Sequence, residues 1–62
     1  MGAVEQVWVL RPAAGRPEAV RALSGTPVHA VGAVGPDGLC EVVLRDGVRV
    51  RVSPAEIVAE RA

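Results

Sequence analysis

Apolar and polar residues alternate over two neighbouring segments of the chain, and this pattern predicts a pair of β-strands. Residues 40–44 read Cys-Glu-Val-Val-Leu and residues 48–52 read Val-Arg-Val-Arg-Val. Alternation with a period of two is typical of a strand with one face in the core. The intervening Arg45-Asp46-Gly47 contains an Asp-Gly pair, which between two such segments indicates a β-hairpin.

The register of this hairpin depends on the length of its loop. A two-residue loop would place Leu44 opposite Arg49 and would mix apolar and charged side chains on each face. A three-residue loop, with Gly47 in the left-handed conformation, pairs Leu44 with Val48 and makes one face wholly apolar. We therefore predict the three-residue loop, with the further pairs Val42 with Val50, Cys40 with Val52 and Glu41 with Arg51.

A second turn extends the predicted sheet toward the amino terminus. Pro36-Asp37-Gly38 repeats the turn chemistry, because proline fixes φ and Gly38 supplies a positive φ. If this loop also has three residues, the pattern predicts a three-stranded antiparallel meander with residues 28–34 as its first strand. The predicted pairs are Val34 with Cys40, Gly32 with Val42, Ala30 with Leu44 and, on the outer face, Val31 with Val43.

Residues 4–11 are rich in β-branched and aromatic residues and predict another strand. Its inward face is ambiguous, because both sets of alternate residues are apolar. Trp8 is the only aromatic residue, and we expect its indole to fill the space over Ala30 and Gly32 in the core. An exposed Trp8 would instead act as an interface anchor or as a platform for base stacking.

Residues 11–27 predict a long loop, because two prolines and a glycine follow the first strand. Within this loop we predict a short helix over residues 17–24, with Pro17 at its first position and Gly25 just after its end. A helix of about two turns forms only when it packs on other elements. Its apolar face would consist of Ala19, Val20 and Leu23.

A helix start follows the hairpin. Ser53-Pro54-Ala55-Glu56 has the form of a capping box with proline at the first helical position, and Ile57 can pack on Val52 as a hydrophobic staple. Two continuations are open: a helix as far as Arg61, or a single turn followed by a short strand over residues 57–60.

The order of these elements resembles that of the SH3-like small barrels, in which a long excursion follows the first strand and a 3₁₀ turn precedes the last. The resemblance is carried by residues 7–10, by the two Asp-Gly turns and by residues 53–57. It implies a mainly β fold in the form of a small SH3-like barrel. The residues themselves also fit a three-to-four-stranded antiparallel meander with one or two short helical segments.

The chain has 62 residues, which predicts one small domain over residues 1–62 with residues 1–3 as a frayed end. So short a chain buries only about 60% of its unfolded surface, so we expect self-association to add to its stability. Cys40 is the only cysteine, which excludes a disulfide within the chain. The sequence shows neither a signal peptide nor a membrane-spanning stretch, and we predict a cytoplasmic protein without a membrane partner.

Seven basic and seven acidic residues cancel, so no overall field attracts nucleic acid. All the basic residues are arginine, which we attribute, with the abundance of Ala, Val and Gly, to a bacterial or phage-like base composition. Catalytic chemistry has no support either, because His29 lacks a nucleophilic partner and Cys40 falls on the apolar face. We predict no enzyme, no catalytic residues, no metal site, no cofactor and no small-molecule substrate.

Two non-enzymatic functions remain. The first is a protein-interaction or assembly module that self-associates or joins a larger complex, with Val31, Val43 and Ala33 as interface candidates on the outer face of the meander. The alternative is a nucleic-acid-binding small barrel that uses an arginine-bearing strand face. Its residues would be Arg45, Arg49 and Arg51, with His29, Arg11 and Arg16 as additions.

Overall fold

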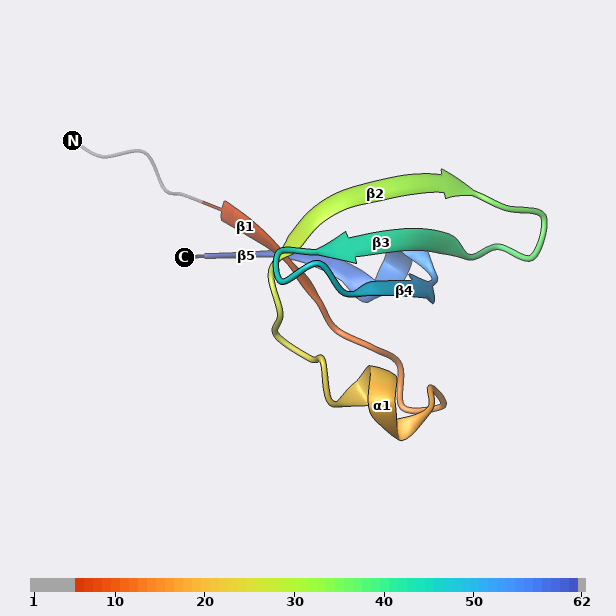
Figure 1. Ribbon diagram of the computed structural model, residues 1–62, viewed down its shortest axis with the longest axis horizontal. Coiled ribbons are helices and arrows are strands. Elements are labelled where there is room, and N and C mark those ends of the chain that lie inside the picture. Colours follow the sequence, from red (N-terminus) through yellow and green to blue (C-terminus); the bar gives the residue numbers. More distant parts are fainter. Residues whose placement is uncertain (1–5, 62) are drawn as a thin grey trace.

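A computed structural model describes residues 6–61 and shows a mainly β fold with two short helical segments, as predicted (Figure 1). Residues 1–5 and 62 lie outside the described part, and with them the predicted frayed segment 1–3. The described strands are β1 (Gln6–Leu10), β2 (Val28–Val34), β3 (Cys40–Leu44), β4 (Arg49–Val52) and β5 (Ile57–Arg61). The helical segments are α1 (Glu18–Arg21) and the 3₁₀ helix η1 (Pro54–Glu56).

The strands form two antiparallel sheets, one of β1 and β5 and one in the order β2-β3-β4. The segment before β2 joins them. Val9 forms an isolated bridge with Pro27, and the amide of Leu10 donates to the carbonyl of Thr26 at 3.0 Å. Over residues 6–61 these two sheets do not close into a barrel, so the fold is an open arrangement of strands.

The hairpin of β3 and β4 has the predicted three-residue loop. The amide of Leu44 donates to the carbonyl of Val48 at 2.8 Å, and Gly47 has a φ of 91°. The predicted pairs Val42 with Val50, Cys40 with Val52 and Glu41 with Arg51 are all present. One residue differs: Val48, placed on the apolar face, is 40% exposed because it lies where the loop leaves the core.

The core lies between the hairpin and the end of β1. It consists of Leu10, Cys40, Val42, Leu44, Val50 and Val52, with Val20, Leu23, Val28 and Ile57 packed against it. The helix α1 is shorter than predicted, since Pro17 is its N-cap and four residues are helical. Val20 and Leu23 face the core as expected, but Ala19 is exposed.

Strand β2 departs from the predicted register. The turn at residues 36–38 has the expected length, because the amide of Gly35 donates to the carbonyl of Leu39 at 2.8 Å, and Val34 pairs with Cys40. Beyond this pair, two register shifts place Val31 opposite Val42 and Val28 opposite Leu44. The predicted pairs of Gly32 with Val42, Ala30 with Leu44 and Val31 with Val43 are therefore wrong.

The physical reason is the spacing of the valines in β2. Directly paired residues point to the same face of a sheet, so Val28, Val31 and Val34 share the face of the buried β3 residues. Their spacing of three matches a spacing of two on β3 because β2 holds an extra residue in each of two β-bulges. Gly32 fits the second bulge, since a Cβ there would lie 3.3 Å from the Glu41 carbonyl oxygen.

The segment after β4 is a 3₁₀ turn followed by a strand, which decides between the two predicted continuations. The hydroxyl of Ser53 accepts a hydrogen bond from the Ala55 amide at 3.3 Å, and the Glu56 carboxylate accepts one from the Ser53 amide at 2.9 Å. The predicted capping box is therefore present, and it places η1 between the two sheets.

Candidate functional site

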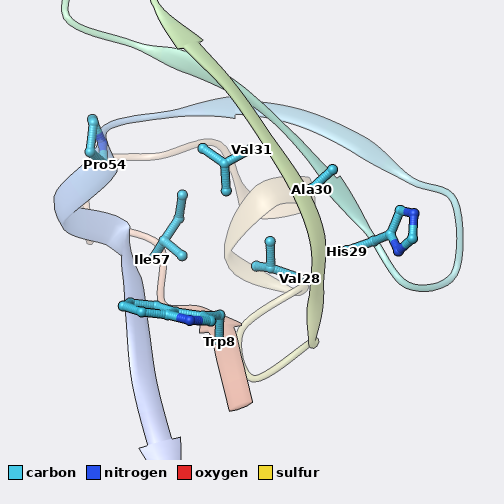
Figure 2. A pocket seen from close by; sticks show the side chains of 7 residues that line it. All are labelled: Trp8, Val28, His29, Ala30, Val31, Pro54 and Ile57. Carbon is cyan, nitrogen blue, oxygen red and sulfur yellow. The ribbon is translucent and has the colours of Figure 1, made fainter. Parts of the chain in front are cut away.

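An open apolar groove of about 380 Å³ lies between β1, β2 and the segment formed by η1 and the start of β5 (Figure 2). Figure 2 shows the side chains of Trp8, Val28, Val31 and Ile57 pointing into a shared space, whereas His29 points away from it. The lining residues are Trp8, Val28, Val31, Pro54 and Ile57, with His29 and Ala30 at the rim. We call this site the apolar groove.

The pairing of β1 with β5 places Trp8 at the groove. Trp8 and Leu10 lie on the same face of β1 because side chains alternate along a strand, yet Leu10 is 0% exposed and Trp8 is 55% exposed. The β5 partner of Leu10 is Ile57, and that of Trp8 is Ala59, whose small side chain leaves the indole uncovered. The expectation that Trp8 is buried over Ala30 and Gly32 is therefore wrong.

The bulged strand β2 supplies the opposite wall. Val31 is 51% exposed and Val34 is 55% exposed, although both share the face of buried β3 residues. Their β3 partners Val42 and Cys40 are fully buried, so the described chain covers β3 at these positions but leaves the valines of the outer strand β2 exposed. Together with Trp8 they form an uncovered apolar surface continuous with the core, and such surfaces are typical of binding sites.

The predicted interface residues do not come together. Val31 belongs to the apolar groove, whereas Val43 is half-buried on the opposite face of the sheet, between its partners Ala30 and Arg49. Ala33 is exposed and does not line the groove. The bulge between Val31 and Val34 causes this separation, because it moves Val31 from the predicted outer face to the inner one.

The predicted basic face is partly neutralised. The Arg51 guanidinium lies 2.7 Å from Asp37 and opposite Glu41 on β3. The Leu39 amide and this guanidinium together lower the pKa of the Asp37 carboxyl. Arg45 and Arg49 are exposed and form no ion pair with any of the residues 6–61.

A buried carboxylate fixes the long loop to η1. Glu56 is 5% exposed and accepts hydrogen bonds from the Ala13 amide at 2.8 Å, from the Ser53 amide at 2.9 Å and from the Arg16 guanidinium. Hydrogen bonds from Arg16 lower the pKa of Glu56 to about 2, and the two amides contribute in the same direction. We call this arrangement the Glu56 clamp; the fold uses its charge, so Arg16 is not available to a basic binding face.

A second ion pair holds the start of the same loop. The guanidinium of Arg11 binds both carboxylate oxygens of Glu60, at 2.6 and 2.7 Å, and its remaining nitrogen lies 3.3 Å from the Ser24 hydroxyl. This contact raises the pKa of Arg11 and lowers that of Glu60. Arg11, like Arg16, therefore stabilises the loop instead of extending the predicted basic face.

Sequence reasoning missed the apolar groove. The available signal was the spacing of three between the valines of residues 28–34, which a regular strand with a period of two cannot place on one face. Cys40, by contrast, lies where it was expected: it is buried, and its Sγ donates to the Val52 carbonyl at 3.4 Å.

No protein-family model, curated protein sequence or solved structure matches this chain. Within the part that the structure describes, none of the helices has the length and apolar character needed to cross a membrane. Over the same residues, no group of three His, Cys, Asp or Glu side chains is placed to hold a metal ion. The candidate binding sites of the described residues are therefore the apolar groove and the exposed arginines.

Proposed function

We propose that this chain is a small protein-interaction module and that the apolar groove is its binding site. The observation that carries the proposal is the position of Trp8, whose indole is 55% exposed beside the exposed Val31. Tryptophan side chains are enriched among the residues that contribute most to protein interfaces. Complete burial of an aromatic side chain removes about 150–250 Å² from water, and at Trp8 a little more than half of its surface is left for a partner to cover.

The lining residues define the chemistry of the partner. The residues around the groove include no Asp, Glu, Lys or Arg, so the groove suits apolar side chains of a protein or peptide. The groove is also preformed, because the Glu56 clamp holds η1, from which Pro54 and then Ile57 extend to the groove. A preformed site avoids part of the entropy lost when a flexible site becomes ordered.

Two further points belong to this proposal. The order β1, long loop, β2-β3-β4, η1, β5 supports a relationship to the SH3-like small barrels, which host many unrelated functions. A buried, unpaired Cys40 supports a site of action in the cytoplasm, where thiols stay reduced.

The test selects peptides from a random display library on the wild-type chain and measures their binding to variants. Trp8→Ala should weaken the selected peptides at least tenfold, because it removes the largest side chain of the groove. Val48→Ala is the matched control, since Val48 is an exposed apolar residue outside the groove, and it should leave binding unchanged. Trp8 is the only tryptophan, so a blue shift of its emission on peptide binding reports directly on the site.

Selected peptides that bind the Trp8→Ala chain as strongly as wild type would refute the proposal. A random-sequence oligonucleotide provides the second arm. Binding that weakens with salt and is lost in Arg49→Ala would instead assign the function to the exposed arginines.

A further inference from the structure

Strand β2 presents a backbone edge without a partner in the described structure. One edge pairs with β3, and on the other side the contact with β1 ends at the bridge between Pro27 and Val9. Val28 is half-buried, and the remaining six residues of β2 are exposed. An exposed edge strand is a template for pairing with another strand.

The four outer strands of the two sheets differ in charge. Edge strands that avoid pairing carry charged residues. The outer strand β4 contains Arg49 and Arg51, and β5 contains Glu60 and Arg61. The seven residues of β2 include no Asp, Glu, Lys or Arg and no proline. Strand β1 also lacks charged residues, but the backbone of its Val9 and Leu10 already contacts Pro27 and Thr26, so β2 offers the longest uncharged edge among the described strands.

The three valines of β2 keep their places when the strand is read backward from Val31, although its other four residues do not. The strand reads Val-His-Ala-Val-Gly-Ala-Val, so reversal exchanges Val28 with Val34 and Ala30 with Gly32. In an antiparallel pair related by a two-fold axis, residue i contacts residue j while j contacts i, so a pair centred at Val31 would place valine opposite valine at all three positions. Reversal also exchanges His29 with Ala33, so the two imidazoles of a pair would not face each other.

The backbone follows the same symmetry. One bulge lies between Val28 and Ala30 and the other between Val31 and Val34, so they flank the central valine on both sides. The two bulges keep all three valines on one face, and a reversed copy presents its own three valines to the same face. An antiparallel pair of β2 strands would therefore continue the apolar face of the groove from one chain into the next.

We propose that the partner of this edge is a second copy of the chain, joined by antiparallel pairing of the two β2 strands about a two-fold axis at Val31. This inference rests on the proposed function in one respect, since Val31 lines the apolar groove, and it assigns the partner class of that surface. Interfaces with less than about 1,200 Å² of total buried area are typical of weak association, and one strand with its valines falls in that class. We therefore expect a reversible dimer at micromolar concentration.

Sedimentation over a range of concentrations tests the assembly, and crosslinking tests the register. Wild type should show a monomer–dimer equilibrium. Val34→Glu should weaken it at least tenfold, because the carboxylate would face Val28 of the second copy without a partner. Val34 does not line the groove, so peptide binding by this variant should persist.

Cysteine substitutions locate the axis. In the proposed register Val31 faces its own counterpart, at a Cα separation of about 4.5–5.5 Å that allows a disulfide. Val31→Cys should therefore crosslink rapidly under mild oxidation, whereas Val34→Cys, which faces Val28, should not. Cys40 is buried and does not compete. Unchanged unfolding midpoints of both variants would show that they fold.

A wild type that stays monomeric up to millimolar concentration would overturn the dimer, as would equal crosslinking of the two cysteine variants. The proposed function fails separately. If the chain is monomeric but its selected peptides depend on Trp8, the groove is a binding site for other proteins; if it dimerises through β2 and selects no Trp8-dependent peptide, only the dimer stands.

Discussion

The two sides of η1 differ in how the molecule covers its core. On the loop side, the Glu56 clamp and the ion pair of Arg11 with Glu60 hold the long loop, from which Val20 and Leu23 pack on the core. On the groove side, Trp8 and the β2 valines extend the apolar surface, and the described chain does not cover them. A small domain buries a smaller fraction of its surface than a large one, and the polar contacts of the described residues concentrate on the loop side.

The contrast is sharpest within β1, where two apolar residues of the same face differ in their exposure to solvent. Leu10 lies in the core and Trp8 lies in the groove. The larger of the two side chains is thus the one that is mainly exposed to water. This difference separates residues that stabilise the monomer from residues available to a partner, and substitutions on the two sides should therefore change different measurements.

The largest expected effect is that of Leu10→Ala. The residue is 0% exposed, so the substitution should reduce the free energy of unfolding by about 3 kcal/mol, through lost burial and a cavity. Trp8→Ala should cost less than about 1 kcal/mol, although it removes more atoms, because the indole is mainly in water. Urea unfolding followed by circular dichroism, at concentrations where the chain is monomeric, measures both. Equal losses would mean that the indole belongs to the core.

The second effect concerns the Glu56 clamp. Glu56→Gln keeps the size of the side chain but removes the charge that binds Arg16 and two amides, and should cost about 2 kcal/mol or more at neutral pH. Glu60→Gln is the control, because it removes a carboxylate from an exposed ion pair and should cost much less. If both variants had the same unfolding midpoint, the loop side would not depend on the buried carboxylate.

The same pair of variants gives a pH test. The folded-state pKa of Glu56 is about 2, below its ordinary value of 4.5, so its contribution is fully present above pH 4.5 and is lost as the pH falls toward 2. The stability difference between wild type and Glu56→Gln should therefore shrink over this window. Asp37 and Glu60, whose pKa values are also lowered, remain in both proteins and cancel in the difference. A difference that stays constant with pH would contradict the role of the charge.

A smaller loss of stability is expected for substitutions at Gly47, and it separates effects of stability from effects of contact at the groove. Gly47 has a φ of 91° and lies in a hairpin loop away from the groove, with no atom near the position of an added Cβ. Gly47→Ala should cost about 1 kcal/mol through backbone strain alone, and Gly47→Asn should cost less, because asparagine tolerates this conformation. Both should retain the binding properties of the groove. Loss of binding in Gly47→Ala would show that stability, and not contact, governs the effects at Trp8.

The smallest effect is that of Ser53→Ala. The hydroxyl accepts a long hydrogen bond of 3.3 Å from the Ala55 amide, so its removal should cost at most about 1 kcal/mol. Ser24→Ala serves as the control, since Ser24 is an exposed serine at a similar distance, 3.3 Å, from Arg11. Thermal unfolding of the two variants would show whether the Ser53 hydroxyl adds to the stability that the Glu56 clamp provides. Identical unfolding midpoints would mean that η1 is stabilised by Glu56 and not by the Ser53 hydroxyl.

The hairpin of β3 and β4 and the cap could be predicted from sequence because local chemistry determines them. Only one loop length gives an apolar face, and Gly47 permits the backbone that this loop requires. Ser53 and Glu56 lie three residues apart, the spacing that a capping box needs. Neither prediction depended on distant residues.

The groove could not be predicted in the same way, because it depends on contacts between distant segments. A regular strand was assumed for β2, and the assumption failed because Val28, Val31 and Val34 obey a spacing of three. The prediction that Trp8 is buried relied on the β2 residues expected opposite it, so it failed together with the predicted register of β2. The contacts of Glu56 with Ala13 and Arg16 likewise join residues that sequence spacing does not relate.

The pairing of β1 with β5 has a consequence for the order in which the protein folds. Gln6 pairs with Arg61, so nearly the whole chain separates the two strands, and bringing them together costs more loop entropy than forming the hairpin of β3 and β4. We expect the hairpin to form early and the β1–β5 pair late, which hydrogen exchange would detect as faster opening of β1 and β5 amides. Because β1 and β5 supply Trp8 and Ile57, the groove would be the last part of the surface to appear during folding and the first to be lost.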